Sequence, residues 1–166
     1  MKKILVLFTI ISLFYSCSEE EIEDDYYHGK VSYYKNNAFK ENICALNFID
    51  DYYFKLWVYN DKNELREELI VEGFDIKAIG VEQDSIVSKY YTLLYDGDVL
   101  QSTYRLDPAV RNYFIIDNYN ESTGDISGRF QLTMSLYRWN DYETEPEFDT
   151  IHFTQGQFET RINYLD

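Results

Sequence analysis

The sequence predicts an all-β domain, either an antiparallel β-sandwich or a flattened barrel of about 8–9 strands. Two observations support this fold class. Apolar and polar residues alternate with a period of two in successive segments, whereas helical periodicity is nearly absent. Aromatic residues make up 18% of the chain, which holds only 2 Pro and 7 Gly. That composition suits a pleated sheet and excludes a disordered or collagen-like chain.

The first expected strands are short. We place them at Lys30–Lys35, Ile43–Ile49 and Tyr52–Tyr59, where apolar residues occupy alternate positions and so share one face. Asp50-Asp51 lies between the second and third strands, as a hairpin turn requires. The next segment, Asp61–Val71, is compatible with a short helix, because two leucines lie four residues apart, and with a strand. We favour the strand.

Further strands are expected at Tyr90–Tyr95 and Val99–Leu106, on either side of Asp96-Gly97-Asp98. The Asp-Gly pair favours the positive φ angles of a hairpin turn. Another strand, Tyr113–Tyr119, leads through the turn Asn120–Asp125 into the longest alternating segment.

That longest segment, Ile126–Leu136, places six residues from Ile126 to Leu136 on one apolar face. Gly128 falls on this face and predicts a bulge or a close backbone contact. In the last strand, Thr150–Tyr164, Gln155-Gly156 interrupts the alternation and predicts a bulge or a tight turn. We expect the apolar positions on both sides of this interruption to face inward: Ile151, Phe153, Phe158, Ile162 and Tyr164.

The N-terminal segment predicts export and lipidation. Residues 1–16 combine two lysines with an apolar run that is too short to span a bilayer as a helix, which is typical of a signal peptide. The run ends at Cys17, and residues 17–26 are mostly acidic and would form a solvated tether. We therefore expect a signal peptide (1–16), a lipidated tether (17–26) and one β domain (27–166).

Two patterns resemble known families. Leu13, Ser16 and Cys17 resemble the lipobox of bacterial lipoproteins, and the acidic run after Cys17 resembles the export signal of Bacteroidota surface lipoproteins. The segments Gly124–Phe130 and Asp149–Phe158 are similar to the G-x-I-S-G-x-F and D-T-I-x-F-T-x-G-x-F strands of small Bacteroidota lipoproteins of unknown function. The resemblance implies a lipid-anchored protein on the outer membrane surface, or alternatively facing the periplasm. It implies no catalytic residue.

Composition limits the chemistry that the chain can perform. A net charge of −15 argues against binding nucleic acid. The two histidines, His28 and His152, accompany no nucleophile motif, and no Cys or His pair has the spacing of zinc ligands. Cys44 shares a face with Leu46, which predicts a buried thiol that packs as a small apolar group. We therefore expect no enzyme activity, no cofactor and no metal site.

The abundance of aromatic residues is the feature that points to binding. Tyr53, Trp57 and Tyr59 fall opposite the apolar face of their strand and form a candidate aromatic platform for a glycan or an envelope protein. Cross-strand packing is the alternative explanation for these rings. The leading functional hypothesis is a non-enzymatic binding domain. The alternatives are a structural or toxin-neutralising envelope component and a hydrolase that uses two carboxylates.

Overall fold

The domain is built from β-strands alone in the part of the chain that the structure describes. This computed structural model describes residues 27–48, 51–60, 62–95, 97–140 and 146–165, so the predicted signal peptide, Cys17 and the predicted acidic tether lie outside it. The strands are β1 (Gly29–Lys35), β2 (Ala38–Phe48), β3 (Tyr52–Tyr59), β4 (Leu65–Glu72), β5 (Val87–Leu94), β6 (Val99–Leu106), β7 (Tyr113–Tyr119), β8 (Asp125–Trp139) and β9 (Thr150–Tyr164). The predicted all-β fold class is confirmed.

The nine strands form one sheet that closes on itself. Its order is β1-β9-β2-β3-β4-β5-β6-β8-β7, and β8 also pairs with β9, which closes a ring. The pairing of β2 with β9 is parallel, whereas every other strand pairing is antiparallel. The ring is not a regular barrel, because β1 is inserted between β2 and β9 and β7 is attached only to the outer edge of β8.

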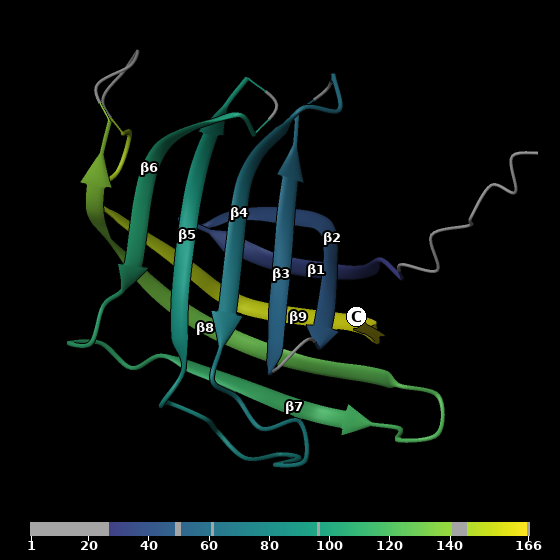
Figure 1. Ribbon diagram of the computed structural model, residues 1–166. Coiled ribbons are helices and arrows are strands. Elements are labelled where there is room, and N and C mark those ends of the chain that lie inside the picture. Colours follow the sequence, from purple (N-terminus) through teal and green to yellow (C-terminus); the bar gives the residue numbers. More distant parts are fainter. Residues whose placement is uncertain (1–26, 49–50, 61, 96, 141–145, 166) are drawn as a thin grey trace, which may run out of the picture.

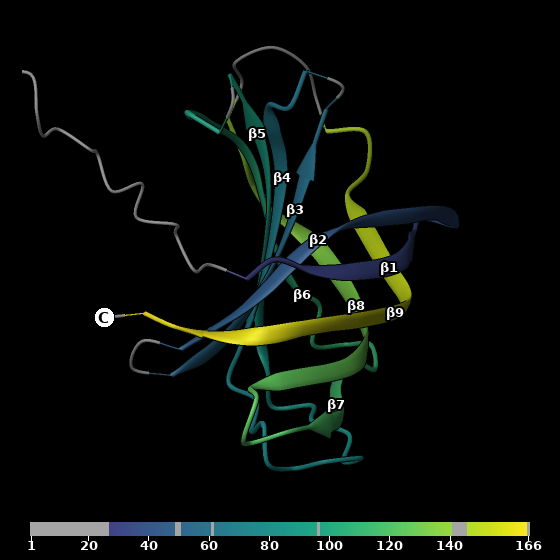
Figure 2. The same ribbon diagram turned by 90° about the vertical axis from the view of Figure 1, so that its right-hand side faces the viewer.

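The ring is flattened into two layers. In Figure 1, β3 to β6 run side by side, and β1, β9, β8 and β7 cross behind them at a steep angle. Figure 2 shows the first layer edge-on with the second beside it. β2 connects the layers, because its first half pairs with β1 and its second half pairs with β3.

The core between the layers is unusually aromatic. Phe54 from the first layer lies 5.9 Å from Phe130 and 4.8 Å from Phe158 of the second, measured between ring centroids. Phe114 stacks on Phe130 and Phe158 at interplanar angles of 17° and 20°. All four rings are buried, so the predicted apolar faces of β3, β8 and β9 meet as alternation requires, together with a ring from β7.

Both interruptions of the strand pattern have a structural cause. A Cβ atom on Gly128 would lie 2.2 Å from the carbonyl oxygen of Ile115, so this glycine marks a close backbone contact. At the second interruption, the register of β8 and β9 shifts between Phe130 and Leu132, and Gln155 takes a φ of 52°. This is the predicted bulge.

The strand that we favoured over a helix within Asp61–Val71 is confirmed, because Leu65–Glu72 forms β4 and Asn63 lies in the preceding turn with a φ of 62°. One expectation was wrong, since Tyr164 does not join the core and is 62% exposed. β9 extends past the core at this point, and Tyr164 lies at the margin of the domain, with its ring 5.9 Å from Phe48 and its hydroxyl beside Tyr52 and Tyr119.

An irregular segment, 73–86, covers the free edge of β7. Phe114 and Gln83 exchange two backbone hydrogen bonds of 3.1 Å, and Gly80 donates a third to the Ile116 carbonyl at 2.7 Å. These bonds occupy backbone groups that an edge strand would otherwise expose to a second chain.

Candidate functional site

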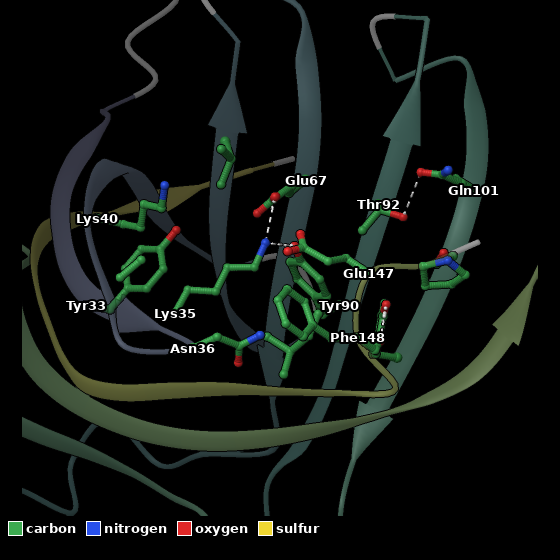
Figure 3. A pocket seen from close by; sticks show the side chains of 16 residues that line it. Tyr33, Lys35, Asn36, Lys40, Glu67, Tyr90, Thr92, Gln101, Glu147 and Phe148 are labelled. Atoms are coloured by element: carbon green, nitrogen blue, oxygen red, sulfur yellow. Dashed lines mark hydrogen bonds and ion pairs between the residues drawn. The ribbon is translucent and has the colours of Figure 1, made fainter. Parts of the chain in front are cut away.

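A cleft of about 520 Å³ opens between the two layers beside the β1–β2 turn. Figure 3 shows side chains of both layers pointing into it. The second layer and its connections contribute Tyr33, Lys35, Asn36, Ala38, Lys40, Pro146, Glu147, Phe148 and Ile151, and the first layer contributes Val58, Glu67, Tyr90, Thr92, Gln101, Ser102 and Tyr104. Its volume lies within the range of small-molecule sites, roughly 300–1,000 Å³.

A charged network crosses the cleft. Lys35 Nζ donates to Glu67 Oε1 at 2.7 Å and to the Tyr90 hydroxyl at 2.6 Å (Figure 3). Lys35 follows Val31 and Tyr33 on the inward face of β1, and Glu67 precedes Leu69 and Val71 on the inward face of β4. Strand alternation therefore places both charged side chains inside the domain, where each charge needs an opposite charge as its partner.

Three phenols surround this network. The Tyr33 hydroxyl accepts a bond from Asn42 Nδ2 at 2.9 Å, and the Tyr104 hydroxyl donates to the Phe148 carbonyl at 2.9 Å. Burial raises the pKa of Tyr33, Tyr90 and Tyr104, and the negative charge of Glu67 adds to the increase in each. All three rings therefore stay neutral at physiological pH and offer apolar faces to the cleft.

The turn at the rim of the cleft has a fixed shape. Asn36 and Asn37 have φ angles of 48° and 68°, as a two-residue type I′ hairpin turn requires. Asn36 is held from both sides by β9, because its N–H donates to the His152 carbonyl at 3.0 Å and its Oδ1 accepts from the His152 N–H at 2.8 Å. These two bonds fix the direction in which the Asn36 amide nitrogen points.

The predicted platform residues lie on the outer face of β3, away from the cleft. Lys55 stands between Tyr53 and Trp57, with Nζ 5.6 Å and 5.9 Å from the two ring centroids. Glu68 receives an ion pair from Lys55 at 3.2 Å and a hydrogen bond from Trp57 Nε1 at 3.2 Å. The rings of Tyr53 and Trp57 therefore already have interaction partners within the chain.

The structure brings two of the three platform residues together. Trp57 and Tyr59 line a shallow groove with Ile43, and Tyr53 lies outside it. The side chain of Tyr59 is 40% exposed and follows a register shift between β3 and β4.

Other candidate chemistry is confined to packing and turns. Cys44 is fully buried, as predicted, and burial raises its pKa to about 12. His152 is exposed, and its Nδ1 lies 3.3 Å from Thr133 Oγ1. Within the described residues, no three His, Cys, Asp or Glu side chains are grouped to hold a metal ion. No helix there is long and apolar enough to cross a membrane.

Sequence reasoning missed the cleft, although two signals were present. Lys35 and Glu67 are charged residues at positions that strand alternation assigns to the inside. Asn36-Asn37 between two alternating segments is a hairpin signal that also predicts the position of the rim. No local sequence motif could have predicted that these residues line one cleft, because they come from β1, β4, β5 and β6 and are brought together only when the ring of strands closes.

A comparison of the chain with protein-family models, with curated proteins and with solved structures finds no match in any of the three.

Proposed function

We propose that the chain is a cell-envelope lipoprotein whose β domain binds a ligand in the cleft and releases it unchanged. The observation that carries this proposal is the cleft itself, about 520 Å³ in volume. Its aromatic walls and fixed polar groups come from both layers, which is the composition of a preformed small-molecule site. A lipid on Cys17 would hold the domain at the outer membrane, on the cell surface or facing the periplasm.

The place where the chain enters the domain suits such an anchor. The backbone of Tyr27, the first described residue, exchanges hydrogen bonds with the Asn163 side chain at 2.7 and 3.0 Å, near the end of β9. β1 then leads away from this point to the turn at Asn36 (Figure 1). A strand of seven residues spans about 23 Å. The cleft therefore lies at the opposite end of β1 from Tyr27, which suits a binding domain that is anchored through Cys17.

The alternative of a carboxylate hydrolase has a specific basis, because Glu67 and Glu147 both line the cleft. A glycosidase needs one protonated carboxyl group as its acid. Glu67 is already bound by Lys35 at 2.7 Å, and Glu147 is exposed to solvent, so neither carboxyl group lies in the apolar pocket that the acid of a glycosidase occupies. We therefore propose binding without catalysis. Intact recovery of each bound ligand is the expected result, and a hydrolysed product would support the hydrolase.

The binding proposal is tested with a variant that fills the cleft. Ala38 is an exposed residue of the cleft wall, so Ala38→Trp blocks the cleft without disturbing the core. Compounds from a library of glycans, lipids and peptides are screened by thermal shift against the full chain and this variant. A ligand at 100 times its Kd adds about 2.7 kcal/mol of stability. The proposal requires compounds that raise the Tm of the wild type and leave that of Ala38→Trp unchanged.

Trp57→Ala is the matched control, because Trp57 belongs to the platform and not to the cleft. A ligand whose effect is lost in Trp57→Ala and kept in Ala38→Trp would place binding on the outer platform and overturn the cleft. The cleft would also be overturned as the binding site if no compound in the library raised the Tm of the wild type more than that of Ala38→Trp.

The anchor is tested separately in cells. Mass spectrometry of the wild-type protein should find an acylated Cys17 in the membrane fraction, and Cys17→Ser should move the protein to the soluble fraction. Protease treatment of whole cells then distinguishes surface exposure from the periplasmic alternative. A wild-type protein recovered without acyl chains would defeat the lipoprotein assignment and leave the cleft proposal standing.

A further inference from the structure

Two buried polar atoms in the cleft have no hydrogen-bond partner among the described residues. They are the amide nitrogen Nδ2 of Asn36 and the hydroxyl oxygen of Ser102. Ser102 is only 1% exposed, and its hydroxyl lies close enough to Tyr104 to oppose the rise in the pKa of that phenol, but it does not meet the geometry of a hydrogen bond. Buried polar groups without partners are rare, because each costs free energy that folding does not recover.

These two atoms belong to opposite walls of one cleft. Asn36 lies in the β1–β2 turn of the second layer, and Ser102 lies in β6 of the first layer. The hydrogen bond that Asn36 Oδ1 accepts from the His152 N–H fixes the Asn36 side chain, and Figure 3 shows its amide nitrogen turned into the cleft. The other two unpartnered atoms, in Asn47 and Trp139, belong to residues that do not line the cleft. Two of the four such atoms in the described part of the chain therefore belong to residues that line this one cleft.

The charges of the cleft favour a neutral ligand. Its described walls carry two lysines, Lys35 and Lys40, against two glutamates, Glu67 and Glu147. Lys35 and Glu67 already neutralise each other at 2.7 Å. The cleft is thus balanced in a chain of net charge −15. An anionic ligand would meet two carboxylates, and a cationic ligand would meet two ammonium groups.

The walls also distinguish a hydroxyl-rich ligand from an apolar one. An aliphatic chain would leave Asn36 Nδ2 and Ser102 Oγ without partners, whereas a ligand that bonds to them recovers part of the cost of about 1–3 kcal/mol that each unpaired group carries. A sugar hydroxyl accepts from the amide and can both accept from and donate to Ser102. The C–H face of a sugar ring packs on rings such as Tyr33, Tyr104 and Phe148, which line the cleft.

We propose that the cleft binds one or two neutral sugar units and that Asn36 and Ser102 are the residues that recognise their hydroxyl groups. This inference rests on the proposed function, since it names the ligand class of the same cleft. A volume of about 520 Å³ suits a ligand of this size.

The test uses defined probes and the full chain. Maltose, cellobiose, lactose and diacetylchitobiose are titrated calorimetrically, with galacturonic acid as the anionic probe, glucosamine as the cationic probe and decanoate, an anion with a long aliphatic chain, as the lipid-like probe. At least one neutral sugar should bind. Asn36→Asp keeps the acceptor for the His152 N–H and loses the donor, and Ser102→Ala removes the hydroxyl. Each should weaken binding by about tenfold, the value of one hydrogen bond.

Ser88→Ala is the matched control. Ser88 is another buried serine on the first layer, 3% exposed, but its hydroxyl donates to the Ile70 carbonyl at 2.9 Å and does not line the cleft. Ser88→Ala should lower Tm and leave sugar affinity unchanged, whereas Ser102→Ala should lose affinity with an equal or higher Tm. A merely structural role for Ser102 would give the opposite pattern.

The outcomes separate this inference from the proposed function. Binding of decanoate, galacturonic acid or glucosamine alone, lost in Ala38→Trp, would keep the cleft as a binding site and overturn the sugar assignment. Sugar binding that is equal in wild type, Asn36→Asp and Ser102→Ala would overturn the role of these two residues. A library in which no compound distinguishes wild type from Ala38→Trp would overturn the proposed function itself.

Discussion

The ring of Phe130 lies directly over Gly156, its cross-strand partner in the β8–β9 pair. A Cβ atom on Gly156 would lie 2.5 Å from this ring, closer than real contacts allow. The reciprocal arrangement occurs two residues away, where Phe158 pairs with Gly128 and its ring would lie 2.7 Å from an added Cβ. Each glycine thus provides the space in which the opposite strand's phenylalanine reaches the core.

This relationship predicts a coupled pair of substitutions. Phe130 is fully buried, so Phe130→Ala should lower the free energy of unfolding by about 3–5 kcal/mol. Gly156→Ala should lower it by about 1–3 kcal/mol, because the methyl group displaces the ring. In the double variant the methyl group enters vacated space, so the loss should be smaller than the sum. Urea unfolding of the four proteins measures the coupling, and strict additivity would contradict the contact.

The same residues show what the sequence could predict. Alternation from Ile126 to Leu136 predicted which side chains of β8 face inward, because one face of that strand is buried and the other is not. The first half of β2 escaped prediction, because Ala38 to Glu41 are exposed and carry no alternation. Gly128 predicted a bulge or a close backbone contact in β8, and Gly156 predicted a bulge or a tight turn in β9. The phenylalanine that each accommodates depends on the register of two strands, which no single segment encodes.

The cleft illustrates a different limit. The platform residues Tyr53, Trp57 and Tyr59 were singled out because they fall on one strand, where spacing can be read directly. Asn36 and Ser102 lie far apart in the chain and meet only when the sheet closes through β8 and β9. Long-range closure is a tertiary property, so only the inward charges Lys35 and Glu67 could have indicated that this part of the interior is polar.

Buried tyrosines predict loss of stability in alkali. Burial raises the pKa of Tyr33, Tyr52, Tyr90 and Tyr104, and it raises that of Tyr119 to about 12. A phenol whose pKa is higher in the folded state binds its proton more tightly there. Its contribution to stability is therefore complete below the unfolded value of roughly 10 and is lost as the pH rises through the folded values.

Urea unfolding between pH 8 and pH 12 measures this effect. Stability should stay level up to about pH 10 and then fall, and absorbance at 295 nm should show that the buried phenols ionise together with unfolding. Tyr90→Phe should reduce the slope above pH 10, although it also leaves Lys35 without one acceptor. A smooth titration of every tyrosine in the folded protein would contradict the burial of these rings.

Cys44 should be chemically inert in the folded protein. The thiol is fully buried, and burial raises its pKa to about 12, so almost no thiolate exists at pH 8. Iodoacetamide at pH 8 should leave Cys44 unmodified in native protein and modify it fully in urea, as mass spectrometry of the tryptic peptide will show. Leu46→Ala, which opens space beside it on the same face of β2, should accelerate the reaction. Rapid native alkylation would mean that the β2 face is open to solvent.

The segment 73–86 should protect the domain from edge-to-edge association. Gln83 both donates to and accepts from the backbone of Phe114 at 3.1 Å, beside the exposed edge of β7. Gln83→Pro removes the donor and should release this edge, which then offers unpaired backbone groups to a second molecule. Light scattering during incubation at 37 °C should detect association of the variant and not of the wild type.

Gln83→Ala is the control for this experiment. It loses the side-chain bonds of 2.6 and 3.0 Å to the Asp75 backbone but keeps the backbone bonds to Phe114. It should therefore remain monomeric, because the edge stays covered. If both variants associate equally, the side chain of Gln83 and not the covered edge is what protects the domain, since only the side-chain bonds are missing from both.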